Sequence, residues 1–182
     1  QLNNKIEEQI QKREHLAAHT ACLKGTMNFA KFQIQSIEQA QQLAQLLASN
    51  CPQPQTTVVG ICEILINAIE HGNLGIDYDQ KTLLHEQGRW PEEVHRLLQS
   101  DEHCEKSIDV HFTRHSDKIT IEVIDQGQGF DWRHYQEIDP LKMLHSHGRG
   151  IAIARALSFD SLDYSPAGNQ VTCTIFTKKE SS

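Results

Sequence analysis

The stretch Glu63-Ile-Leu-Ile-Asn67-Ala-Ile-Glu-His71-Gly72-Asn73 carries three polar side chains at four-residue intervals within an apolar run. Because an α-helix turns about once in 3.6 residues, Glu63, Asn67 and His71 lie on one face of a predicted helix. An ordinary solvent-exposed face would explain such a stripe. However, a carboxylate and an amide bracketed by Ile and Leu residues would cost stability if buried without partners. The pattern therefore favours a site for Mg²⁺ and water, because Mg²⁺ takes oxygen ligands.

A second segment, Ile124-Asp125-Gln126-Gly127-Gln128-Gly129-Phe130, follows directly after a predicted strand. Two glycines one residue apart, Gly127 and Gly129, allow the backbone to approach a ligand closely. Asp125 at the strand end can accept hydrogen bonds from that ligand. A tight turn at the end of a strand explains the same pattern about as well.

A third segment, His147-Gly148-Arg149-Gly150-Ile151-Ala152, enters a predicted helix. Glycines before a helix N-terminus expose backbone N–H groups that can cradle phosphates, and the helix dipole assists them. Glycine is also common in ordinary loops, so this segment alone does not define a site. The sequence has no Walker A pattern and no complete GxGxxG followed by a suitable acidic residue, which disfavours P-loop and Rossmann nucleotide sites.

Two predicted helices precede most of the predicted strands. Ser36 followed by Gln39 forms a capping-box pattern, and the helix that it starts ends before Pro52. Thr56 is expected to cap the second helix, with Gly72 at its C′ position. The polar stretch 77–107 is expected to be irregular, with one short helix that starts near Pro91.

The strand pattern is clearest in the second half of the chain. Apolar residues alternate with polar ones over 108–112 and 119–123, and a turn at 115–118 joins them as a hairpin. Further strands are predicted over 27–34, at 162–164 and from 171 onward. Helices first and hairpin-connected strands later predict an α+β sandwich, in which helices cover one face of an antiparallel-rich sheet.

The composition is that of a soluble domain, with 182 residues, 38% of them hydrophobic and 23% charged. The formal net charge is −7 and the basic residues are scattered, so we expect no contact with nucleic acid. No apolar run approaches the roughly 20 residues that span a bilayer, so no membrane contact is expected either. The five cysteines are odd in number and form no CxxC pair, which is typical of reduced thiols in the cytoplasm.

Taken in order, the three segments resemble the N-box, G1-box and G2-box of the GHKL ATPase superfamily, which includes gyrase, MutL, histidine kinases and anti-sigma serine kinases. The resemblance covers residues 26–177, and the ordered trio is specific where each member is not. ExxxNAxxHG and the compact GRGIAIARAL of 148–157 resemble the anti-sigma kinase version. The resemblance implies the Bergerat ATP-binding fold over 26–182, a two-layer sandwich with an antiparallel-rich mixed sheet. Residues 1–25 would be a helical linker from an upstream domain.

The resemblance also implies roles for individual residues in binding ATP and Mg²⁺. Asn67 would bind Mg²⁺, and Glu63 would be the base for the attacking hydroxyl. Asp125 would read the adenine amino group, while Gly127 and Gly129 would shape the pocket. The other expected nucleotide-binding residues are His71, Gly148, Arg149 and Gly150, with 131–146 as the ATP lid.

The stretch 77–107 is an insertion relative to anti-sigma kinases of this type. It resembles the arrangement in GHKL modules attached to bacterial response regulators and serine phosphatases, so an upstream receiver or phosphatase domain is expected. The implied activity is that of a serine/threonine kinase that phosphorylates a STAS-type antagonist protein; a sigma-factor partner and a homodimer are compatible with it. The alternative is a nucleotide-gated protein-binding module without significant kinase activity. A histidine kinase is disfavoured, because the sequence around His15 lacks the acidic residue that directly follows the histidine in such motifs.

Overall fold

The computed structural model describes residues 25–129 and 158–177, and the expected N-terminal helical linker therefore lies outside the described residues. The elements in chain order are β1 (Phe29–Ile34), α2 (Ile37–Ala48), α3 (Pro54–Asn67), the π-helix η1 (Ala68–Asn73), α4 (Tyr78–Glu86), α5 (Trp90–Leu98), β2 (Ile108–Arg114), β3 (Lys118–Ile124), β4 (Ser161–Tyr164) and β5 (Gln170–Phe176). This confirms the predicted α+β order, with most helices before most strands.

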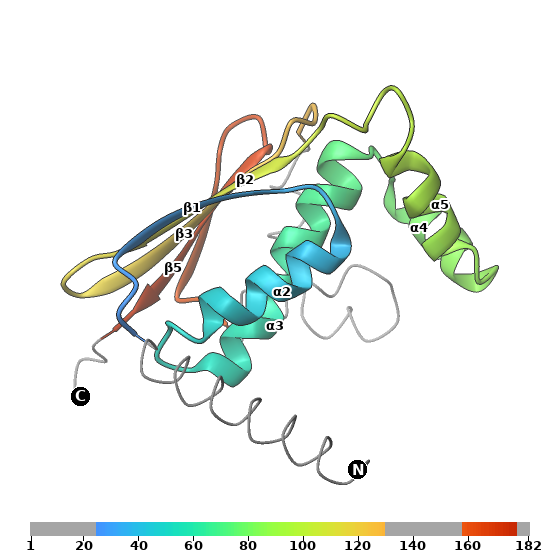
Figure 1. The fold of residues 1–182 in the computed structure, drawn as a ribbon. Coiled ribbons are helices and arrows are strands. Elements are labelled where there is room, and N and C mark those ends of the chain that lie inside the picture. The colour runs from blue at the N-terminus through green and yellow to red at the C-terminus, as the bar shows by residue number, and fades with distance from the viewer. Residues whose placement is uncertain (1–24, 130–157, 178–182) are drawn as a thin grey trace, which may run out of the picture.

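The five strands form one sheet in the order β1-β2-β3-β5-β4, and each of its four pairings is antiparallel. Helices α2 and α3 lie side by side on one face of the sheet (Figure 1). The predicted two-layer sandwich is therefore confirmed. The predicted hairpin is formed by β2 and β3, in which Val110 lies opposite Val123 and Phe112 opposite Ile121.

The two faces of the sheet differ in polarity because side chains alternate along each strand. Val110, Phe112 and Ile121 point toward the helices and are buried with Leu47 of α2. The opposite face is polar: His111 contacts Glu122 at 2.8 Å across strands β2 and β3. The helices therefore pack on the apolar face, which is what the period of two in the sequence predicts.

Helix α2 begins as predicted, with Ser36 and Gln39 forming a reciprocal capping box. The predicted start and end of the second helix were wrong. Helix α3 begins at Pro54, which suits the first turn because proline has no N–H to leave unpaired. At its other end the helix does not stop at Gly72 but widens into η1, and Gly75 takes the left-handed conformation, with φ +67°.

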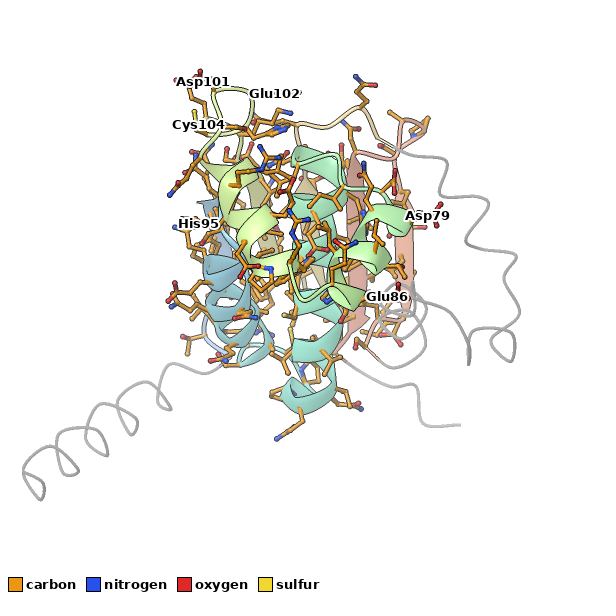
Figure 2. The ribbon with its side chains drawn as sticks, turned by 90° about the vertical axis from the view of Figure 1, so that its right-hand side faces the viewer. Asp79, Glu86, His95, Asp101, Glu102 and Cys104 are labelled. Atoms are coloured by element: carbon orange, nitrogen blue, oxygen red, sulfur yellow. The ribbon has the colours of Figure 1, made fainter. Side chains whose placement is uncertain are left out.

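The insertion 77–107 contains two helices, whereas the sequence predicted one. The helix near Pro91 is α5, and the one not predicted is α4, which Asp77 and Gln80 cap reciprocally. Helix α4 was not predicted because its sequence is polar and contains few apolar residues that would mark a buried face. The rings of His85 and Trp90 stack with centroids 5.2 Å apart and join the two helices. Both helices lie on the same side of the sheet as α2 and α3 (Figures 1 and 2).

Two neighbouring leucines of α2 allow a test of the core. Leu47 lies on the buried face of α2 and is fully buried, whereas Leu46 is 41% exposed. Leu47→Ala should lower the free energy of unfolding by about 2–5 kcal/mol, because it removes packed methyl groups and leaves a cavity. Leu46→Ala, the control with the same change of residue, should alter it by less than about 1 kcal/mol. Urea unfolding of both variants measures this, and equal losses would contradict the described packing.

Candidate functional site

A cavity of about 240 Å³ lies between the end of the α3–η1 helix and the sheet. Its apolar wall includes Ile64 and Ile76 from the helical side and Val123 and Val171 from the sheet. The segments that form it are far apart in the sequence: α3 with η1, residues 75–77, the end of β3, and the β4–β5 hairpin. The polar side chains among the described lining residues are Asn67, His71, Asp77, Asp125, Tyr164 and Gln170.

The η1 end of the long helix packs closely against the end of β3. A Cβ atom on Gly72 would lie 2.4 Å from Cγ of Asp125. A Cβ atom on Gly127 would lie 2.2 Å from the carbonyl oxygen of Gly72. Contacts this short do not occur between real atoms, so both positions require glycine. Glycine at Gly72 therefore serves this close approach and not the helix C-cap that the sequence suggested.

Gly129 is required for a different reason. Its φ of +78° lies in the left-handed region, and a Cβ atom there would be 1.9 Å from the carbonyl oxygen of Ala167. Gly129 also lines the cavity, whereas Gly127 packs behind it against Gly72. Gly129 therefore serves a tight turn, and Gly127 allows a close approach to Gly72 of the protein itself, whereas the predicted approach to a ligand stays a prediction.

Asp125 supplies a half-buried carboxyl to the cavity. Its Oδ1 accepts the N–H of Gly127 at 2.8 Å, which orients the carboxylate. Burial raises the pKa of Asp125 to about 6, and the hydrogen bonds from the backbone N–H groups of Gly127 and of Asp125 itself oppose that shift. A carboxyl with a raised pKa beside an apolar cavity is a candidate binding group.

His71 lies in η1 and shapes one wall of the cavity. Its Nδ1 contacts the carbonyl oxygen of Ile76, so Nδ1 carries the proton and donates it. Burial lowers the pKa of His71, and the nearby Lys81 ammonium acts in the same direction, although the Ile76 contact opposes them. The imidazole is therefore neutral at neutral pH, and it holds the 75–77 segment against the helix.

Asn67 and Glu63 lie one turn apart on α3 with different relations to the cavity. Asn67 lines it, whereas Glu63 is half-buried and not among the described lining residues. Within the described residues, no group of three or more His, Cys, Asp or Glu side chains could hold a metal ion. The cavity still fits Mg²⁺ carried by a nucleotide, because Asn67 offers an amide oxygen and such an ion takes its other ligands from phosphates and water.

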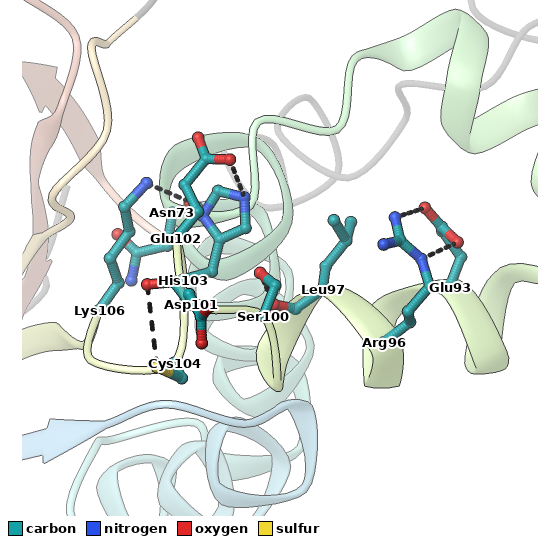
Figure 3. A network of polar contacts seen from close by, with 10 residues as sticks. All are labelled: Asn73, Glu93, Arg96, Leu97, Ser100, Asp101, Glu102, His103, Cys104 and Lys106. Atoms are coloured by element: carbon teal, nitrogen blue, oxygen red, sulfur yellow. Dashed lines mark hydrogen bonds and ion pairs between the residues drawn. The ribbon is translucent and has the colours of Figure 1, made fainter.

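Several residues of the site were not predicted from the sequence. Asn73, which is 3% exposed, accepts the N–H of Gln126 through its Oδ1 at 2.8 Å. Its carbonyl oxygen accepts a hydrogen bond from Nζ of Lys106 at 3.0 Å, as Figure 3 shows. Glu70, fully buried in η1, pairs with Lys81 of α4 at 2.5 Å. The sequence predicted none of these contacts. Only Asn73 stood next to a predicted feature, because it directly follows Gly72.

The structure thus brings four predicted site residues to one cavity, namely Asn67, His71, Asp125 and Gly129. Gly127 supports the cavity from behind, and Glu63 lies one helical turn away. The expected phosphate-binding residues Gly148, Arg149 and Gly150 and the expected lid at 131–146 lie outside the described residues.

An α+β sandwich with a half-buried carboxyl at a strand end, which faces the polar stripe of an otherwise apolar helix across a cavity, is the architecture that the GHKL resemblance implies. The model of the histidine kinase-like ATPase domain matches residues 33–175, so the chain belongs to that family. A comparison with curated proteins gave no match. The family match confirms an ATP-binding domain of the GHKL type. Among the described helices, none has the length and apolar character needed to cross a membrane.

The raised pKa of Asp125 predicts how ligand binding depends on pH. Adenosine affinity should rise as the pH increases from 5 to 7 and then level off, because only the ionised carboxylate accepts a strong hydrogen bond from an amino group. One pH unit below the pKa of about 6, affinity should be roughly tenfold weaker. Adenosine is the probe because it has no phosphate that titrates in this range. Calorimetric titration of the parent and of Asp125→Asn measures the effect, and a persistent pH dependence in Asp125→Asn would contradict it.

Proposed function

We propose that this domain is an ATP-dependent serine/threonine kinase whose substrate is a STAS-type antagonist protein in a bacterial partner-switching pathway. The observation that carries the proposal is the pair Glu63 and Asn67 on α3. Asn67 lines the cavity, and Glu63 lies one helical turn, about 6 Å, toward the N-terminus of α3. A kinase needs one group at the phosphates and another at the attacking hydroxyl.

Recognition of adenine rests on Asp125. Since Oδ1 accepts the N–H of Gly127, the second carboxylate oxygen, Oδ2, is the one that would accept the adenine amino group. The purine ring would lie between the apolar walls that Ile76 and Val171 contribute. Guanine carries a carbonyl where adenine carries its amino group, so GTP should bind poorly.

The phosphates would extend from the cavity along α3, where Asn67 would hold Mg²⁺ through its side-chain oxygen. The ion, when bound, would neutralise charge on the transferring phosphoryl group. Glu63 would orient the substrate hydroxyl and accept its proton. The bond from the γ-phosphorus to its bridging oxygen breaks as the bond to the serine oxygen forms. Gly148, Arg149 and Gly150 would complete the phosphate site.

The remaining parts of the proposal concern the setting of the domain. Residues 1–25 would connect it to an upstream receiver or phosphatase domain. A sigma factor and a second copy of the chain are further partners that the resemblance allows, and the protein would act in the cytoplasm.

A second candidate function is a nucleotide-gated binding module, which would hold ATP or ADP and change partners without much chemistry. The position of Glu63 favours it, since Glu63 is not among the described residues that line the cavity. The two functions differ in whether phosphate reaches the partner.

Two substitutions on α3 distinguish the candidates when γ-labelled ATP and a STAS-domain protein encoded beside this chain are used. Asn67→Ala should impair Mg²⁺-dependent ATP binding and phosphotransfer together, because both need the ion. Glu63→Gln should leave ATP binding nearly intact and reduce transfer about 10²–10⁴-fold, the usual effect of removing a positioned base. Glu38→Gln, an exposed change on α2, is the control and should match the parent.

One outcome would overturn the kinase proposal. The parent would transfer no phosphate to its partner, while Glu63→Gln would still capture or release that partner in an ATP-dependent way. The domain would then be a nucleotide-gated binding module.

A further inference from the structure

Asn73 lies where η1, the loop after β3 and the residues before β2 meet. It ends η1 and is 3% exposed, so its polar atoms need partners within the protein. Its Oδ1 accepts the backbone N–H of Gln126 at 2.8 Å, and its carbonyl oxygen accepts a hydrogen bond from Lys106. The side chain of Asn73 thus bonds to the loop that follows β3, 53 residues later in the sequence.

Gln126 continues this network toward β2. Its Oε1 accepts the backbone N–H of Ser107 at 3.0 Å, and Ser107 is buried directly before the strand. Asn73 and Gln126 together therefore join the end of η1, the loop after β3 and the start of β2. We refer to the hydrogen bond from the N–H of Gln126 to Asn73 and the one from the N–H of Ser107 to Gln126 as the Asn73 clamp.

The clamp acts directly on the backbone of Asp125. The nitrogen of Gln126 belongs to the planar peptide group that begins with the carbonyl of Asp125, so fixing that N–H fixes the plane. On the other side, the N–H of Asp125 donates to the carbonyl oxygen of Asn169 at 3.0 Å. The main chain of Asp125 is thus held from both sides, and Gly127 is placed to donate to its Oδ1.

We propose that Asn73 is a positioning residue for nucleotide recognition: it holds the Gln126 peptide so that Asp125 presents its Oδ2 to the adenine amino group. The inference rests on the proposed role of Asp125 in adenine binding. Asn73 touches no ligand itself and acts through the backbone.

A purely structural role for Asn73 predicts a different result in the pH profile. The hydrogen bond from Gly127 lowers the pKa of Asp125, so a looser loop should raise that pKa and move the midpoint of adenosine binding to higher pH. A loss of stability alone leaves the midpoint unchanged. The other titratable side chains among the described cavity residues are His71, Asp77 and Tyr164, and they are the same in every variant.

The experiment is adenosine titration from pH 5 to 8, with thermal unfolding of each variant. Asn73→Leu removes the acceptor and should weaken binding roughly tenfold at pH 8, where Asp125 is ionised, and raise the midpoint. Asn73→Asp keeps an acceptor oxygen and should recover most of the affinity at pH 8.

Ile175→Val, a change in the sheet core, is the control for lost stability. It should lower the melting temperature and leave the adenosine affinity and the midpoint of its pH dependence unaltered. Should Asn73→Leu fail to fold, Asn73→Ser replaces it, because the serine side chain is too short to reach Gln126.

Asp125→Asn separates failure of this inference from failure of the proposed function. If Asp125→Asn weakens adenosine binding while Asn73→Leu keeps the parent affinity and midpoint, the positioning role is overturned and the adenine role of Asp125 stands. If Asp125→Asn binds adenosine as tightly as the parent, the adenine role fails, and the inference fails with it.

Discussion

The contact between Gly72 at the end of the long helix and Asp125 and Gly127 at the end of β3 is the constraint on which the site depends. Because Gly72 and Gly127 have no Cβ atom, the helix and the strand approach each other more closely than any side chain at these two positions would allow. Gly72 and Asp125, which meet there, both line the cavity, and Gly127 packs against Gly72. The glycines therefore determine how closely the helical wall of the cavity approaches the end of β3.

The long helix ends in the π-helical turn η1, which contains Gly72. Turns of this kind are rare and are frequently found at functional sites. Here η1 carries His71 to the carbonyl oxygen of Ile76 and buries Glu70 against Lys81 of α4. The wall of the cavity and the attachment of the inserted helices thus arise from one irregular turn, which Gly75 then ends.

Burial of a carboxylate is unfavourable for folding, and the raised pKa of Asp125 expresses that cost. The protein offsets part of it with the hydrogen bond from Gly127 to Oδ1. In the proposed adenine site this carboxylate would discriminate between ligands, because a base without the matching donor would leave it without a partner. The neutral imidazole of His71 adds no charge to this environment.

The sequence by itself determined the sandwich, because alternation of period two and a capping box are local patterns that depend on near neighbours. It also predicted Asn67, Asp125 and Gly129 as site residues from short sequence motifs, and all three line the cavity. Only the tertiary structure decided that Gly72 serves a helix–strand contact, that Gly75 ends the helix and that Asn73 holds Gln126. The assignments of Gly72 and Asn73 depend on contacts between residues about 50 positions apart, which no local pattern records. Helix α4 was missed because few apolar residues in its sequence mark a buried face, although Asp77 caps it and its Lys81 pairs with Glu70.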